Sequence, residues 1–199
     1  MKHYLIAAAF CLASSACAPQ GSDEIAMPDD ATVAARSMPI AEEFQAQLKE
    51  QLVAALGQGG PEAAVGVCKE AAPAIAAGQS EASGAQVSRI AQRHRNPAGA
   101  VPAELRTAYD ELATMPLVDG KPASRVVHTG EGGDARVVYL SAVPMAEQPC
   151  SVCHGANVDP ALKAVIDSAY PGDTAVGFEP GDLRGALVIS WPREAFTAR

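Results

Sequence analysis

The sequence predicts an α+β domain behind an export signal, and three observations support this class. Apolar residues recur at helical spacing through the first half of the chain, β-branched residues cluster on both sides of a glycine-rich turn at residues 130–134, and another β-rich segment lies at residues 187–191. The chain has 199 residues, of which 48% are hydrophobic, so it is long enough for one domain with its own core.

An export signal is predicted at residues 1–18. Lys2 precedes a short apolar run that ends in small residues, and this run is too short to span a bilayer. Cleavage after Ala18 would remove the signal, whereas lipoprotein-type processing would leave Cys17 as a lipid anchor. Both routes predict a periplasmic protein, with contact to the membrane only through a lipid on Cys17.

The mature chain is expected to begin with a linker. Residues 19–38 lack hydrophobic periodicity and predict a flexible segment, so residues 39–199 are assigned to the domain. The formal net charge of −8 argues against nucleic acid or an anionic membrane surface as a partner.

Two helices are expected at the start of the domain. Residues 40–56 form the first, because their apolar residues repeat every four positions, and the glycines that follow predict its end. Pro61 suits the first position of the second helix, whose apolar face includes Cys68. Pro73 cannot donate a hydrogen bond to the carbonyl of Lys69, so a kink or an early end is predicted there.

The later elements are predicted from turn signals and periodicity. A strand or short helix leads into a turn at Asn96-Pro97, the glycine-rich segment indicates a β-hairpin, and Asp159-Pro160 is typical of a helix start. The expected segments are residues 85–93 (strand or short helix), 102–114 (helix), 124–129 and 135–142 (hairpin strands), 159–169 (helix) and 187–191 (strand).

The most specific motif is Cys150-Ser151-Val152-Cys153-His154. Cys-x-x-Cys-His is the attachment signature of c-type haem, in which each thiol forms a thioether with one vinyl group and the adjacent His154 can bind iron as the proximal ligand. A zinc site would need a second ligand pair, and a redox dithiol normally follows a strand at a helix start, whereas the flanking residues indicate a loop. The sequence therefore predicts one covalent haem c on Cys150 and Cys153.

Of the five cysteines, Cys11 lies in the predicted signal, Cys17 is removed or lipidated, and Cys150 and Cys153 are assigned to haem, which leaves Cys68 alone. An unpaired thiol in an oxidising compartment needs a reason, and two remain open: a buried, inert core residue, or the second axial ligand of the iron. Other side chains are weaker candidates for that ligand, because each has a simpler role in the core, in a loop or on the surface. They are His94, His128, Met115 and Met145.

A basic cluster precedes the turn at Asn96-Pro97 and contains Arg89, Arg93 and Arg95. One interpretation is a solvated basic edge. The other is that these guanidinium groups bind the haem propionates, since a guanidinium pairs with a carboxylate through two parallel hydrogen bonds.

The order of these motifs resembles a family of exported, PAS-like, monohaem c-type domains that is catalogued as a domain of unknown function and occurs as free proteins and as sensor modules. The resemblance spans about residues 40–191. It implies a PAS-like twisted antiparallel sheet with N-terminal and flanking helices, and axial ligation by His154 and Cys68. We also expect Arg89, Arg95 and Asn96 among the cofactor-binding residues. The segments that carry it are residues 65–69, Ala72-Pro73, Arg89, residues 95–97, 149–155, Tyr170-Pro171, Gly177-Phe178 and residues 181–186.

The expected function is electron transfer by a low-potential c-type cytochrome, because a thiolate ligand donates charge to the iron and favours Fe(III). The alternative is a haem-based redox or gas sensor, for NO or CO, that acts through a partner. Enzymatic activity is not expected, because two axial protein ligands leave substrate no position on the iron. The expected partner is a redox protein or a signalling protein.

Overall fold

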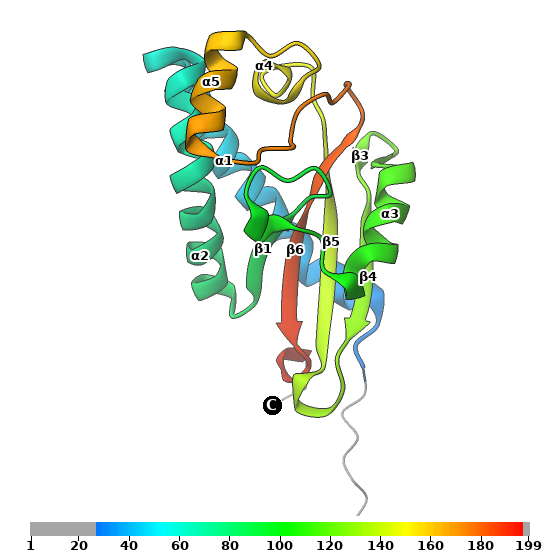
Figure 1. The fold of residues 1–199 in the computed structure, drawn as a ribbon. Helices are drawn as coiled ribbons and strands as arrows, with labels where there is room; N and C mark the ends of the chain where they lie inside the picture. The colour runs from blue at the N-terminus through cyan, green and yellow to red at the C-terminus, as the bar shows by residue number, and fades with distance from the viewer. Residues whose placement is uncertain (1–26, 197–199) are drawn as a thin grey trace, which may run out of the picture.

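The protein folds around a four-stranded antiparallel sheet (Figure 1). The structure is a computed structural model that describes residues 27–196, so the predicted export signal, Cys17 and the start of the predicted linker lie outside the described residues. The strands run in the order β1 (Gln86–Ile90), β6 (Leu183–Pro192), β5 (Arg136–Pro144) and β4 (Ser124–Thr129). A second, two-stranded sheet joins β2 (Leu117–Val118) to β3 (Lys121–Pro122).

The predicted hairpin is confirmed as β4 and β5. Val126 pairs with Tyr139 and Val127 with Val138, and residues 130–135 connect the two strands. The last strand is longer than predicted, because β6 begins at Leu183 rather than at residue 187. The sheet places β6 between β1 and β5, so the segments on either side of the Cys-x-x-Cys-His motif become neighbours.

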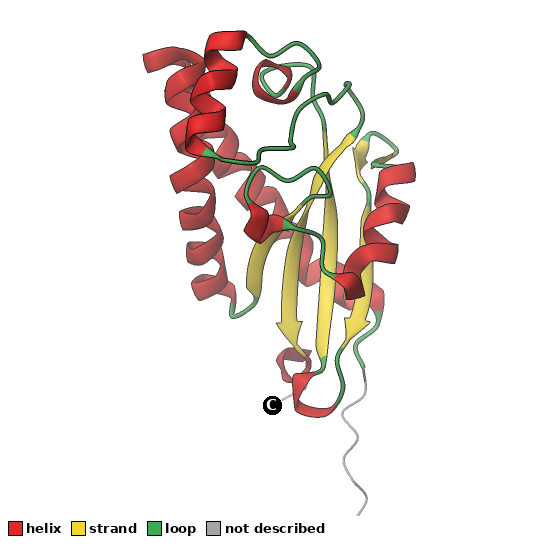
Figure 2. Ribbon diagram, in the orientation of Figure 1, coloured by secondary structure: helices red, strands yellow, loops and turns green. Residues whose placement is uncertain are grey.

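Both faces of the sheet are covered by helices (Figure 2). Side chains alternate between the faces, so Val137 and Tyr139 pack in a core cluster with the N-terminal helix, whereas Val138 and Leu140 pack in a second cluster on the opposite face. The second cluster contains α3 (Arg106–Thr114), which follows a 3₁₀ turn at Ala103–Leu105. The predicted helix at residues 102–114 is thereby confirmed.

The N-terminal helix α1 (Asp30–Gly66) is longer than predicted. Asp29 caps it, because the carboxylate accepts a hydrogen bond from the backbone N–H of Thr32 at 2.8 Å. The prediction of a linker through residue 38 is wrong: Val33 and Ser37 are fully buried, and Ser37 accepts a hydrogen bond from the indole of Trp191 at 2.9 Å. The domain therefore includes residues 30–38.

The predicted helix end after residue 56 appears as a break inside α1. Gly60 has φ of +68°, a conformation that other residues rarely adopt, and a new helical segment starts at Pro61. A π-helical turn, Val67–Ala71, then carries Cys68 and leads into α2 (Ala72–Ser83). Within it, the N–H of Ala72 bonds to the carbonyl of Val67, which shifts the hydrogen-bond pattern just before Pro73. The irregularity predicted near Pro73 is this turn.

Two helices follow β5. The single-turn helix α4 (Ser151–His154) contains the Cys-x-x-Cys-His motif except for Cys150, which is its N-cap, and α5 (Pro160–Ala169) starts at the predicted Asp159 cap. Leu162 and Ile166 of α5 pack on Val65 at the end of α1, and this small cluster also contacts Cys153. Within residues 27–196, no helix is both long enough and apolar enough to cross a membrane.

Candidate functional site

The Cys-x-x-Cys-His motif forms one tight turn that brings its first and last residues together. The N–H of His154 bonds to the carbonyl of Cys150 at 3.0 Å, and the N–H of Gly155 bonds to that of Ser151 at 2.9 Å. Gly155 cannot be replaced by a larger residue, because a Cβ there would lie 2.6 Å from the carbonyl oxygen of Ser151. Both motif thiols are unpaired and half-buried, and they are therefore available for covalent attachment.

The imidazole of His154 is oriented by a backbone carbonyl from a distant loop. Its Nδ1 lies 2.7 Å from the carbonyl oxygen of Ala175, so Nδ1–H donates and Nε2 keeps its lone pair. Burial, together with the charges of Arg184 and Arg95, lowers the pKa of His154 well below its ordinary value. The ring is therefore neutral at neutral pH, which is the form that binds a metal. Phe178 meets the ring edge-on, with 6.4 Å between ring centroids.

His154 lines a cavity of about 820 Å³ between α2, β1 and the loops around the motif. Ligand and cofactor sites are commonly of this size. The cavity brings together five of the predicted site residues: Cys68, Arg89, Arg95, Asn96 and His154. The other two, Cys150 and Cys153, are not among the residues that line the cavity: Cys153 packs on the α5 cluster, and Cys150 packs on a cluster around Met145.

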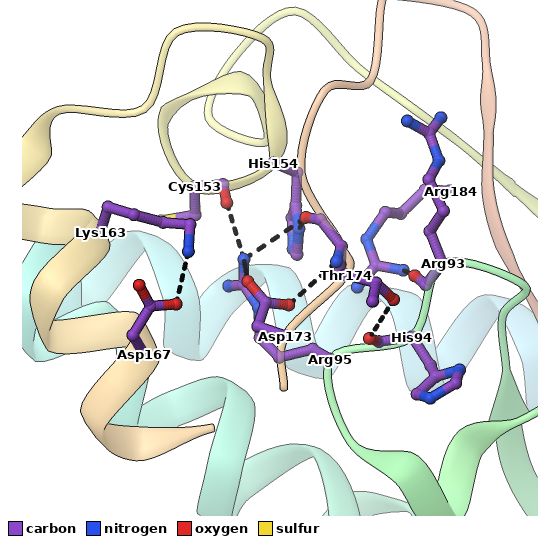
Figure 3. A network of polar contacts seen from close by, with 11 residues as sticks. Arg93, His94, Arg95, Cys153, His154, Lys163, Asp167, Asp173, Thr174 and Arg184 are labelled. Carbon is purple, nitrogen blue, oxygen red and sulfur yellow. Dashed lines mark hydrogen bonds and ion pairs between the residues drawn. The ribbon is translucent and has the colours of Figure 1, made fainter. Parts of the chain in front are cut away.

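Arg95 donates hydrogen bonds to protein groups from its Nε and Nη2 (Figure 3). Its side chain is 6% exposed and forms an ion pair with the fully buried carboxylate of Asp173, with Nε 3.1 Å from Oδ1. The same guanidinium donates to the carbonyls of Cys153 at 2.7 Å and Ala175 at 3.4 Å. Arg95 was predicted to bind a cofactor carboxylate. In the structure its Nε and Nη2 instead bond to Asp173 and to the backbone around the motif.

Arg89 and Arg184 lie in the same cavity without a carboxylate partner among the described residues. Arg184 is 9% exposed, its Nε has no hydrogen-bond partner in the described part of the chain, and one terminal nitrogen donates weakly to the carbonyl of Arg93 at 3.4 Å. Burial and the charges of Arg89 and Arg95 lower the pKa of Arg184 to about 9. The cavity thus presents buried positive charge that an anionic group would satisfy.

Arg184, Asp173 and Ala175 were not predicted as site residues. A signal for Arg184 exists in the sequence, since it is the one charged residue in the apolar run 183–189. Asp173 follows Tyr170-Pro171-Gly172, a turn-like sequence that gives no signal for a buried acid. Ala175 contributes a backbone carbonyl, for which no side-chain pattern gives a signal.

The weaker candidate ligands lie in different surroundings. His128 is half-exposed on β4, where its Nε2 lies 3.6 Å from the carboxylate of Asp30. Met115 is 51% exposed, and Met145 is buried against Ala175 and Phe178. His94 lines the cavity, and its buried Nδ1 has no partner within residues 27–196.

Two further predicted residues, Arg93 and Asn96, are held by protein groups. Arg93 stacks on Phe178, with 3.5 Å between the guanidinium carbon and the ring centroid, and donates to the carbonyls of Val176 and Gly177. The side chain of Asn96 accepts a hydrogen bond from the N–H of Ala98 at 3.1 Å, and caps the 3₁₀ turn at Pro97–Gly99.

Comparison with known proteins gives one family and one fold. The model of the Tll0287-like family matches residues 23–192. The crystal structure of the cyanobacterial haem protein Tll0287 superposes with a TM-score of 0.60 at 22% sequence identity, covering 83% of this chain and 97% of that chain. At this identity the likeness concerns the fold, and it supports the α+β class. No curated protein matches the chain.

Proposed function

Since this chain belongs to the Tll0287-like family, we propose that it is a periplasmic, monohaem c-type cytochrome that transfers electrons at low potential. A bound haem would supply a reversible Fe(III)/Fe(II) couple. The observation that carries the proposal is the convergence of His154, the last residue of the Cys-x-x-Cys-His motif, and the unpaired thiol of Cys68 on one cavity. The family match and the description of Tll0287 as a haem protein support the same cofactor.

The motif residues carry the attachment in this proposal. Cys150 and Cys153 would each form one thioether bond, and His154 would bind the iron through Nε2, because its Nδ1 is already engaged with the carbonyl of Ala175. The neutral state of the ring supports this assignment, since a protonated imidazole cannot act as a ligand. All three side chains are half-buried, which leaves an edge of the site near the surface for electron exchange with a partner.

The charges of the cavity also suit a haem, which carries two propionates. Within residues 27–196, Arg89, Arg95 and Arg184 have one carboxylate partner, Asp173, which pairs with Arg95, so the other two guanidinium groups remain uncompensated in this part of the chain. The orphaned Nε of Arg184 is a direct sign of a missing acceptor. We assign Arg184 and Arg89 to the propionates, and Arg95 to the support of the motif.

Cys68 is the second side chain that would hold the iron. It lies on the cavity from the π-helical turn that joins α1 to α2, and none of the described cysteines is in a disulfide. A thiolate from Cys68 would stabilise the ferric state and lower the reduction potential. With His154 and Cys68 both holding the iron, the site would exchange electrons without catalysing a reaction. The same family resemblance supports a PAS-like description of the β1-β6-β5-β4 sheet and an exported location.

The proposal is tested by the haem content and absorption spectrum of the protein produced with the cytochrome c maturation machinery. We expect one covalent haem per chain and a low-spin ferric spectrum with thiolate features that disappear in Cys68→Ser. The matched control is Met145→Leu, which removes a buried sulfur that does not line the cavity and should leave the spectrum unchanged. Protein without covalent haem would refute the proposal, and a Cys68→Ser spectrum identical to wild type would remove Cys68 from the iron.

A second candidate function is a redox or gas sensor, and the π-helical turn Val67–Ala71 favours it. Such turns are often found at functional sites, and a one-residue change of hydrogen-bond partner would move Cys68 relative to the cavity. In this function a bound haem would offer a position for NO or CO, Cys68 would be the side chain that gives up its hold on the iron, and a partner protein would receive the signal. Ferrous protein that remains six-coordinate through Cys68 in the presence of NO would exclude it.

A further inference from the structure

Asp173 is a buried acid with no role in the function proposed so far. Its side chain is fully buried and lies in the loop between α5 and β6. Its Oδ1 accepts hydrogen bonds from the Nε of Arg95 at 3.1 Å and from the backbone N–H of Ala175 at 3.0 Å, while Oδ2 accepts from Nη2 of Arg95 at 3.3 Å. The carboxylate of Asp173 therefore joins the segment that carries Arg95 to the loop that follows α5.

These contacts converge on the groups that surround His154 (Figure 3). The carbonyl of Ala175, which accepts from Nδ1 of His154 at 2.7 Å, belongs to the residue whose N–H is held by Asp173. Arg95, oriented by Asp173, donates to the carbonyl of Cys153, the residue before His154. The histidine is consequently fixed from both sides: through its backbone by Arg95, and through its ring by the Ala175 carbonyl.

We propose that Asp173 is a positioning residue for His154, acting through the N–H of Ala175 and the guanidinium of Arg95. The inference rests on the proposed function, because it concerns the ring nitrogen that would face the iron. The hydrogen bond from Nδ1–H to the Ala175 carbonyl selects the tautomer with a free Nε2 and sets the plane of the ring. Groups that hold a ligand in this way tune the basicity and orientation of a metal-bound imidazole.

A purely structural ion pair would stabilise the fold without affecting the ring. The geometry favours the positioning role because Asp173 bonds directly to Ala175 as well as to Arg95. Asp173→Asn keeps an oxygen that can accept from the N–H of Ala175 but loses the charge, whereas Asp173→Ala loses both. The two variants therefore separate the orientation of the ring from the effect of one negative charge.

The experiment compares haem-loaded wild type, Asp173→Ala and Asp173→Asn by ferric electron paramagnetic resonance and by midpoint potential. We expect Asp173→Ala to show shifted or multiple sets of low-spin g-values and a raised potential, because a loosely oriented imidazole donates less to the iron. Asp173→Asn should keep more of the wild-type signal. The matched control is Asp167→Asn, which breaks the solvent-exposed ion pair with Lys163 on α5 and should change neither quantity.

The inference would be overturned if Asp173→Ala kept the wild-type g-values and both variants shifted the midpoint potential equally. That result would show that Asp173 acts on the iron only through its charge. If Asp173→Ala does not accumulate, Arg95→Lys decides, because it keeps the charge but cannot reproduce the two-point contact with Asp173: altered g-values support positioning and unaltered ones overturn it. The haem content of wild type reports on the proposed function separately, since wild type without haem refutes that function before any variant is compared.

Discussion

Arg95 and Arg184 share one cavity and one chemistry but differ in their partners. Both guanidinium groups are more than nine-tenths buried. Arg95 forms an ion pair with Asp173 and donates to two carbonyls, whereas Arg184 makes one weak hydrogen bond to the carbonyl of Arg93 and leaves its Nε unsatisfied among the described residues. Arg95 therefore binds groups of the protein itself. Arg184 is a buried cation that could still bind an anionic ligand.

This difference separates two kinds of buried charge. A buried charge with a partner holds the residues around a site in place. Its removal leaves the partner charge buried and uncompensated, which is strongly destabilising. An unpaired charge costs stability until an anion binds, so its removal is expected to help the empty fold and to harm the loaded one. Substitutions of Arg95 and Arg184 test this distinction, and substitutions of Asp182 and Lys163 test it on ion pairs closer to solvent.

The largest effect is expected for Arg95→Met. This substitution leaves the carboxylate of Asp173 buried without a counter-charge, and we expect the free energy of unfolding to fall by about 3–5 kcal/mol. Urea denaturation of the haem-loaded protein, followed by far-ultraviolet circular dichroism, measures it. Arg125→Met is the control, because its partner Glu111 is exposed. A loss of unfolding free energy below about 1 kcal/mol, which is the range of exposed ion pairs, would show that the pair of Arg95 and Asp173 does not hold the fold together.

Arg184→Met should have different effects on the stability of the haem-free and the haem-loaded protein. The pKa of Arg184 is lowered to about 9, so below that pH the folded state carries the full cost of the buried charge, and this cost is present at neutral pH. We expect Arg184→Met to stabilise the haem-free protein by about 1–4 kcal/mol at pH 7. In the haem-loaded protein the gain should disappear, because a propionate partner is lost. Equal shifts in melting temperature in both states would argue against Arg184 as an anion partner.

A smaller effect is expected for the half-exposed pair of Arg93 and Asp182. Their charged atoms lie 3.4 Å apart, and the side chains are 42% and 43% exposed. Asp182→Asn keeps the acceptor for the N–H of Glu179 and removes only the charge, so we expect a loss of about 0.2–1 kcal/mol that shrinks as salt is added. Denaturation at low and high ionic strength measures it. A loss independent of salt would indicate a hydrogen-bonding role in place of an electrostatic one.

The smallest effect is expected for Lys163 and Asp167, an i,i+4 pair on the exposed face of α5. Lys163→Gln should lower the free energy of unfolding by about 0.3–0.5 kcal/mol, which is typical of such pairs on a helix surface. The measurement is again urea denaturation, with Asp167→Asn as the reciprocal variant. A loss as large as that of Arg95→Met would show that burial does not set the ranking of these ion pairs.

The elements that local sequence signals specify were predicted well. Asp159-Pro160 predicted the start of α5, and the glycine-rich segment 130–134 predicted the hairpin of β4 and β5. In each case the information lies within a few residues: a cap that accepts from nearby N–H groups, or a turn flanked by β-branched residues. The family was also recognised correctly from the order of short motifs.

The N-terminal end of α1 shows where local information was insufficient. Residues 30–38 lack clear periodicity and were predicted as a linker, yet Val33 and Ser37 are fully buried. The partner of Ser37 is the indole of Trp191, which is 154 residues away in the sequence. Tertiary packing, rather than helix propensity, therefore holds this segment in place.

The candidate site divides in the same way. The residues Cys150, Cys153 and His154 and their chemistry are determined by the sequence, because their spacing lies within one turn of the chain. The partners of His154 come from the carbonyl of Ala175 and from the pair of Arg95 and Asp173, which are separated by 78 residues. Backbone carbonyls and buried ion pairs leave no periodic signal, because they form only where the fold brings distant segments into contact. The sequence thus specifies which side chains can hold the cofactor, and the packing around them sets how each one is oriented and which charges remain free.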